Sequence, residues 1–377
     1  MSAAPAGQGE AFHIPSLDGI RAVSFLLVFA AHAGLERIVP GGFGVTVFFF
    51  LSGYLITTLM RREREKTSTV SLRQFYLRRA LRILPPFYLV LGLASLAASV
   101  GVLAGGVSPR ALAAQALHLA NYWVVLYGYG GQASGTGVYW SLAVEEHFYL
   151  VFPLIYLFLS RSGASQRKQA NVVWGLAFLV LAWRCVLVYG IGVSTDRTYV
   201  ASDTRVDSIL FGCALALAGN PMLDAPSRMP SWVWKGVLLP AGLFGLLVSF
   251  VYRDPAFRET FRYTLQGISL LPIFVVAMRY PTWGPFKLLN HRWASFIGVL
   301  SYSLYLVHHV VIRVLDPLPI GAFGRGLVAL ALSVALSWLI YRFVEKPCAK
   351  LRKRLSSERP ATKPRSDDLA ALAGAER

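Results

Sequence analysis

Two carboxylates and an imidazole stand side by side within an apolar stretch of the sequence. The stretch is YWSLAVEEHFYLVFPLIYLFL, residues 139–159, and its three ionisable residues are Glu145, Glu146 and His147. An imidazole can act as a general base, and a carboxylate can orient such a base. Because consecutive helix positions diverge by about 100°, the three side chains face three directions. We therefore do not expect the trio to form an active site by itself.

An arginine and a histidine lie eleven residues apart in the run LDGIRAVSFLLVFAAHAG. Eleven residues make about three helical turns, so Arg21 and His32 share one face, about 16 Å apart along the axis. A neutral imidazole at His32 can take the proton of a hydroxyl nucleophile. A structural interpretation stays open, in which Asp18 and Arg21 pair at the helix start and His32 bonds to a neighbouring helix.

Two more arginines share a helix face in the segment YLRRALRILPP. Arg79 and Arg82 are three positions apart, and guanidinium groups bind phosphate oxygens in pairs. This spacing predicts a site for a phosphate-bearing ligand, with contact to lipid headgroups as the open alternative.

A polar stripe runs along the segment SYSLYLVHHVV. Ser301, Tyr305 and His308 follow one another at offsets of four and seven, which places them on one side of a helix. We interpret this stripe as the lining of a polar path, with His309 pointing about 100° away from it.

Further ionisable residues occur in two other apolar runs. Arg184 lies at a depth comparable with that of Glu145 and Glu146, and it can neutralise one of these carboxylates. Arg205 and Asp207 are expected to pair at a helix entrance, in the run SDTRVDSILFG. Structural ion pairing remains an alternative to a catalytic role for all of these groups.

The elements that position these residues are membrane helices. Of the 377 residues, 55% are hydrophobic and 15% are charged, whereas soluble domains carry nearer a quarter charged residues. The net charge of +18 is concentrated in a few loops, as the positive-inside rule requires, so we do not expect nucleic-acid binding. The three cysteines form no CxxC pair, and we expect no metal.

We predict an all-α polytopic bundle of about ten transmembrane helices. The apolar runs are 18–34, 43–60, 83–104, 139–159, 171–190, 206–219, 232–252, 263–280, 294–314 and 322–344. The segment 61–82 carries eight Lys or Arg residues and should be cytoplasmic. The other basic loops also fall on the cytoplasmic side only if residues 111–127 do not span the membrane. We therefore predict cytoplasmic termini and an amphipathic or re-entrant outer helix at 111–127.

The expected domain organisation is simple. Residues 1–15 are predicted to be disordered, 16–345 to form one membrane domain, and 346–377 to form a basic, disordered cytoplasmic tail. The segment YGYGGQASGTG, 127–137, is expected to be a flexible connector, with a substrate lid as the alternative.

Taken together, six stretches resemble the acyltransferase-3 family of integral membrane acyltransferases. They are LDGIRAVSFLLVFAAH, FGVTVFFFLSGYLI, RRALRILPPFY, YWSLAVEEHFYLVFP, TRVDSILFG and SYSLYLVHH. They occur in the family's order over about residues 16 to 345. The Arg-x10-His of Arg21 and His32 and the Arg-x-x-Arg of Arg79 and Arg82 are the most specific of these marks.

The resemblance implies transfer of an acyl group, usually acetyl, from cytosolic acyl-CoA to a hydroxyl of a surface glycan or lipid-linked sugar. It implies an integral, multi-pass protein of a bacterial-type inner (plasma) membrane, surrounded by membrane lipids, that uses acyl-CoA as co-substrate. His32 would be the catalytic histidine with Glu145 as supporting carboxylate, and Arg21, Arg79 and Arg82 would serve the donor. Matching positions also imply acceptor contacts from Tyr139, Trp140, Tyr305 and His308. No family role follows for His147, where many members carry Gln.

Two other functions stay open on the sequence. One is acylation of a small secondary metabolite such as a macrolide, which the resemblance also allows. The other is a proton-coupled transporter or flippase, because intramembrane carboxylates and histidines also form proton relays. The absence of an internal repeat argues against transport.

Overall fold

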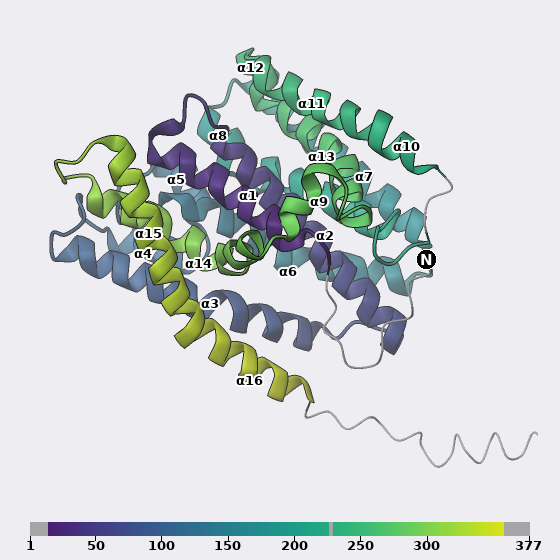
Figure 1. Ribbon diagram of the computed structural model, residues 1–377, viewed down its shortest axis with the longest axis horizontal. Coiled ribbons are helices and arrows are strands. Elements are labelled where there is room, and N and C mark those ends of the chain that lie inside the picture. The colour runs from purple at the N-terminus through teal and green to yellow at the C-terminus, as the bar shows by residue number, and fades with distance from the viewer. Residues whose placement is uncertain (1–13, 226–228, 358–377) are drawn as a thin grey trace, which may run out of the picture.

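Helices make up the structure of residues 14–225 and 229–357, the part of the chain that the computed structural model describes (Figure 1). The α-helices are α1 (Leu17–Ala30), α2 (Gly41–Thr67), α3 (Leu72–Ser99), α4 (Pro109–Ala116), α5 (Ala120–Tyr127), α6 (Trp140–Arg161), α7 (Gln166–Cys185), α8 (Thr195–Val200), α9 (Ser202–Leu217), α10 (Ser231–Val233), α11 (Leu239–Val251), α12 (Pro255–Glu259), α13 (Phe261–Arg279), α14 (Arg292–Leu315), α15 (Ala322–Ile340) and α16 (Lys346–Ser357). Short 3₁₀ or π-helical turns are η1 (Ala31–Leu35), η2 (Gly137–Tyr139), η3 (Val186–Ile191), η4 (Trp234–Leu238), η5 (Gly284–Asn290) and η6 (Tyr341–Glu345). These residues contain no strand.

Nine helical segments of the described chain are long and apolar enough to cross a membrane. They are α1 with η1, α2, α3, η2 with α6, α7 with η3, α10 through α11, α13, α14, and α15 through α16. The predicted class of an all-α, multi-pass membrane protein is confirmed. The cytoplasmic location of the termini stays a prediction.

The tenth predicted span, 206–219, corresponds to a short enclosed helix. Helix α9 has 16 residues, and all but three of them are buried. It packs against α2, α7 and α13 at the centre of the bundle. Because protein covers it on every side, α9 does not need the length of a lipid-facing span.

Glycines bring α2 and α9 into backbone contact. A side chain at Gly53 would overlap the carbonyl oxygen of Ile209, and one at Gly212 would overlap that of Phe50. Gly53 therefore has a packing role between these two helices. This close approach fixes α9 and its charged residues against α2.

The segment 111–127 forms two short helices. Helices α4 and α5 have eight residues each, about 12 Å of helix apiece, and His118 between them adopts a φ of 54°. Neither helix alone is long enough to span a bilayer, as the prediction requires, and the placement of this segment on the outer side stays a prediction.

The C-terminal tail is more ordered than expected. The sequence predicts disorder from residue 346, but residues 346–357 form α16, which continues from η6 and packs beside α3 (Figure 1). Arg352 is the half-buried basic residue of α16 and lies within electrostatic reach of Arg82. Packing against α3 therefore supplies order that composition does not indicate. Residues 1–13 and 358–377, the rest of the two expected disordered segments, lie outside the described residues.

Replacing Gly53 by alanine should destabilise the protein. The added methyl group would meet the backbone of α9, and such overpacking costs about 1–3 kcal/mol. The matched control is Gly92→Ala on α3, where the space is open and alanine favours the helix. Thermal unfolding of the detergent-solubilised protein should show a lower Tm for Gly53→Ala alone. Equal Tm values for the two variants would contradict the α2–α9 contact.

Candidate active site

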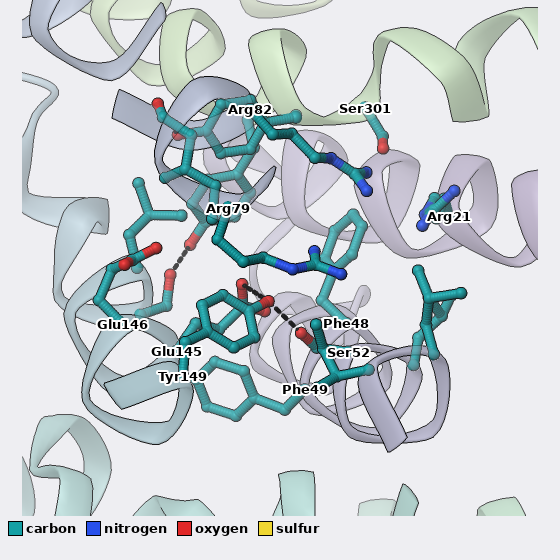
Figure 2. Close-up of a pocket in the computed structure, with 18 of the residues that line it drawn as sticks. Arg21, Phe48, Phe49, Ser52, Arg79, Arg82, Glu145, Glu146, Tyr149 and Ser301 are labelled. Carbon is teal, nitrogen blue, oxygen red and sulfur yellow. Dashed lines mark hydrogen bonds between the residues drawn. The ribbon is translucent and has the colours of Figure 1, made fainter. Parts of the chain in front are cut away.

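Three arginines line one small cavity between α1, α2, α3, α6 and α14. The cavity has a volume of about 100 Å³ and is lined by Arg21 from α1 and by Arg79 and Arg82 from α3. Figure 2 shows the guanidinium groups of Arg79 and Arg82 extending toward Arg21. The sequence prediction that these residues share a site therefore matches their placement. We call this space the arginine cavity.

Two of these arginines are available to an anion. Arg21 pairs with Asp18 at 2.8 Å, as expected for positions three apart. Arg79 and Arg82 form no ion pair within the described part of the chain, and Arg79 lies over the ring of Tyr149 at 5.4 Å. The neighbouring Arg78 turns away from the cavity and pairs with Glu63 at 2.6 Å. Unpaired guanidinium groups facing a cavity are suited to phosphate oxygens.

Glu145 lies with the arginines and not beside His32. It lines the arginine cavity, where the Tyr149 hydroxyl donates to its Oε2 at 3.1 Å and also hydrogen-bonds Ser52 (Figure 2). The interpretation of Glu145 as the carboxylate that supports His32 is thus corrected. Helical rise places both residues near one depth, but His32 lies in the exposed turn beyond α1, whereas Glu145 is half-buried inside α6.

His32 occupies a π-helical turn at the C-terminal end of α1. The turn η1 carries Gly34 at φ 102°, and π turns of this kind often occur at functional sites. The His32 Nδ1 lies 3.1 Å from Nε2 of His308, which is fully buried on α14. The sequence-predicted stripe on α14 therefore supplies a partner for His32.

The hydrogen bonds of His308 assign the tautomer of both rings. Its Nδ1 lies 2.8 Å from the carbonyl oxygen of Tyr305 and 3.1 Å from that of Leu304. Carbonyl oxygens only accept, so Nδ1 of His308 carries the proton and its Nε2 accepts from His32 Nδ1–H. A neutral His32 then has an unprotonated Nε2, which is the form that a general base requires.

A third histidine belongs to the cluster although its helix position points elsewhere. The rings of His309 and His32 stack with centroids 4.5 Å apart. The sequence places His309 correctly at about 100° from the stripe. The sequence does not reveal that His32 lies between the side chains of His308 and His309. His308 contacts the edge of the His32 ring, and His309 contacts its face. Nowhere in the described residues do three His, Cys, Asp or Glu side chains form a metal-ligand group.

Two wide clefts meet at His32. One has a volume of about 560 Å³ and the other about 540 Å³, and His32, Val138, Trp140 and Tyr199 line both. We call the first the basic cleft, because its further lining includes Arg37, Arg253, Arg258 and Arg262. We call the second the glycine cleft, because its further lining includes Gly105, Gly106, Gly130, Gly131, Gly135 and Gly137.

The arginine cavity adjoins the basic cleft. Val45 and Tyr305 line both spaces. The Tyr305 hydroxyl is held by Ser141 Oγ at 2.6 Å and by the carbonyl of Val138 at 3.2 Å. A group passing from the arginines to His32 would therefore have to pass Tyr305.

The residues predicted to contact the acceptor divide into two groups. Trp140 lines both wide clefts and Tyr305 lines the basic cleft. Tyr139 is buried and its hydroxyl donates to the carbonyl of Leu306 at 2.9 Å, so it positions α14 and lines none of the cavities described above. His308 is buried, hydrogen-bonds His32 and lines none of these cavities. His147 bonds Ser202 at 2.6 Å, away from these cavities.

Arg184 pairs with Asp207, not with Glu145 or Glu146 as the sequence predicts. The Nη2–Oδ2 distance is 2.7 Å, both side chains are fully buried, and the remaining Arg184 donors meet Thr204, Thr260 and Thr264 oxygens. This pair is structural.

The expected Arg205–Asp207 pair is also wrong. Positions two apart on a helix point to opposite sides and do not meet. Arg205 instead lies 4.1 Å from the ring centroid of Tyr263 and donates to the carbonyl of Tyr199 at 3.0 Å. Its charge also faces the rings of Tyr199 at 5.3 Å and Trp140 at 5.5 Å, the two aromatic residues between the wide clefts.

Comparison with known proteins identifies the class. The family model described as an acyltransferase domain matches residues 14–342, nearly the whole chain, and the chain therefore belongs to this acyltransferase family. This confirms the resemblance seen in the sequence motifs. Together with the apolar helices, it makes the chain a multi-pass bacterial membrane protein.

The sequence identity to individual relatives is 28–30%. The chain is 28% identical to the peptidoglycan O-acetyltransferase OatA of Listeria monocytogenes, over 90% of this chain and 56% of the relative. It is 30% identical to a Bacillus subtilis protein named "Putative peptidoglycan O-acetyltransferase YrhL", over 89% and 55%. It is 29% identical to a Staphylococcus aureus protein named "Putative O-acetyltransferase SACOL0978", over 93% and 59%. The chain thus spans a little over half the length of these relatives, and no solved structure matches it.

Removing Arg184 should cost stability, because Asp207 would be left charged and buried. Breaking a buried ion pair in this way costs about 3–5 kcal/mol. Arg184→Met should therefore lower the Tm strongly, whereas Arg184→Met combined with Asp207→Leu should recover most of the loss. Thermal unfolding of the three proteins measures both effects. A double variant as unstable as the single one would show that the pair is not the cause.

Proposed function

We propose that this chain is an O-acyltransferase that moves an acetyl group from acetyl-CoA to a hydroxyl of a bacterial surface glycan. The observation that carries the proposal is the position of His32, an exposed imidazole with a fixed tautomer at the junction of two wide clefts. The printed names of the relatives support acetyl transfer to a cell-wall glycan.

The donor is assigned to the arginine cavity. CoA carries several phosphate charges at the end remote from its thioester, and Arg79 and Arg82 offer guanidinium groups without carboxylate partners. The cavity is small, which suits the extended arm that joins the phosphates to the thioester. In this proposal the arm runs past Tyr305 and brings the thioester to His32, about 16 Å of helix from Arg21.

The transfer step follows from the tautomer of His32. Its Nε2 takes the proton of the acceptor hydroxyl as the hydroxyl oxygen attacks the thioester carbonyl carbon. The carbon–sulfur bond then breaks, and the departing CoA sulfur receives that proton from His32, so CoA leaves as a thiol. His308 Nε2 accepts the hydrogen bond from His32 Nδ1–H and so offsets the positive charge that develops on His32. The Nδ1–H of His308 continues to donate to the carbonyl oxygens of Tyr305 and Leu304.

Replacing His32 by alanine should lower kcat for acetyl transfer by roughly 10²–10⁴-fold, the usual contribution of a general base. CoA release from acetyl-CoA in the presence of acceptor, with the protein in nanodiscs, measures this rate. His308→Gln should lower kcat less and leave KM for acetyl-CoA unchanged. The matched control is His147→Gln, a histidine outside these cavities. Near wild-type turnover by His32→Ala would refute the assignment of the base.

Changing both Arg79 and Arg82 to glutamine should raise KM for acetyl-CoA. Each lost bond to a phosphate is worth about 1.5–3 kcal/mol, so the increase should be roughly tenfold or more. The control is Arg78→Gln, because Arg78 lies outside the arginine cavity and pairs with Glu63. An unchanged KM in the double variant would place the donor elsewhere.

A further inference from the structure

We propose that the acceptor is an extended glycan chain bound on both sides of His32, and that an internal sugar of this chain receives the acyl group. This inference rests on the proposed function and narrows its substrate class. It concerns which acceptor the two clefts can hold, and so separates a polymer from a small metabolite.

The position of His32 between the clefts is the first argument. A site for one small molecule is a single pocket, commonly of about 300–1,000 Å³, with the reacting group at its wall. Here the basic cleft and the glycine cleft, of about 560 and 540 Å³, each reach that size, and both are lined by His32. A single sugar at His32 would leave most of both clefts empty, whereas a chain would continue into each.

The surface between the clefts is the second argument. The rings of Trp140 and Tyr199 lie with centroids 4.9 Å apart, and both residues line both clefts. Trp140 is only 5% exposed and Tyr199 is half-buried, so the ring of Tyr199 is the aromatic face that a sugar ring can reach. Arg205 lies beneath both rings and holds the Tyr199 carbonyl at 3.0 Å, so this floor is fixed before a ligand arrives. A rigid aromatic floor reduces the entropy lost on binding a flexible chain.

The glycine cleft is lined mainly by backbone and neutral side chains, with Arg313 as its one Lys or Arg residue in the described part of the chain. Its wall includes backbone of the segment 130–137, which contacts α14 because Gly135, at φ 88°, lies against Val310. Gln132 lines the same cleft and is 7% exposed, and its amide nitrogen has no partner in the described residues. Its oxygen accepts from Gln115 at 2.9 Å, which fixes the side chain. A spare amide donor of this kind suits a sugar hydroxyl or an acetamido oxygen.

The basic cleft offers charge. Arg253 and Arg258 line it and are exposed, and Arg262 lines it with an Nε that has no partner among the described residues. Such groups suit carboxylate or phosphate substituents of a glycan. The basic cleft also contains Glu36 and Glu259, and the glycine cleft contains Arg313, so both clefts can hold a glycan with anionic substituents.

The test uses oligosaccharides of increasing length with the full protein in nanodiscs. They are prepared by partial digestion of surface glycans from a strain lacking this protein and are separated by size. We expect kcat/KM, measured by CoA release, to rise at least tenfold with length and then level off once both clefts are filled. Fragmentation mass spectrometry should place the acetyl group on internal sugars.

Equal kcat/KM for the shortest and longest acceptors, or acetyl groups on terminal sugars alone, would overturn the inference while leaving the proposed function intact. Failure to acetylate any length would contradict the proposed function itself. The two failures are therefore distinguishable in one experiment.

Variants of each cleft give a second readout. Tyr129→Ala in the glycine cleft and Arg258→Gln in the basic cleft should each flatten the rise of kcat/KM with length, by roughly tenfold at the longest acceptor. The matched controls are Tyr127→Ala and Arg110→Gln, two exposed residues that line neither cleft. A length dependence that stays as steep as in the wild type in both cleft variants would contradict binding on two sides.

Discussion

The hydrogen bond between His32 and His308 is the interaction on which the candidate site depends. It exists because α1 and α14 pack in parallel, and backbone contacts at their other end set the alignment. A side chain at Gly298 of α14 would overlap the backbone of Asp18, and one at Gly19 would overlap that of Leu289 in η5, the turn that precedes α14. These contacts bring the two helices together and align them, so that the imidazoles meet one helix length away. The carbonyl partners of His308 then fix which nitrogen of His32 lacks a proton.

Charge within the membrane divides into two kinds by its partners. Arg184 and Asp207 satisfy each other and are surrounded by threonine oxygens, so their role is to hold α7, α9 and α13 together. Arg205 lies against aromatic rings instead of a carboxylate. It holds Trp140 and Tyr199, which line both clefts together with His32. Arg79 and Arg82 remain without ion pairs in the described residues, although an ionisable group in a membrane helix is costly. Glu145 and Glu146 line the same cavity and offset part of this cost without forming ion pairs in the described part of the chain, and a phosphate-bearing ligand would supply further negative charge.

The helix period predicts relations within one helix well and relations between helices poorly. The shared faces of Arg79 with Arg82 and of Ser301 with Tyr305 follow from 3.6 residues per turn, and all four residues line the arginine cavity. The shared face of Arg21 with His32 stays a prediction, because His32 lies in the π-helical turn η1. Depth along the helix axis does not show which helices are neighbours. The sequence therefore predicts Glu145 next to His32, whereas the structure places it with the arginines. The same limit explains the wrong partners of Arg184 and Arg205. The roles assigned to these residues stay predictions, because placement alone does not test them.

The unequal sizes of the cavities give the proposed reaction a direction. The arginine cavity is small and meets the basic cleft only at Val45 and Tyr305 among the residues that line both. In the proposed reaction the arm of the donor occupies this smaller space and the acceptor stays in the wide clefts, so only the acyl group passes between them. Tyr305 is held by Ser141 and Val138 at this junction, so the path from the arginines to His32 passes a side chain of fixed orientation.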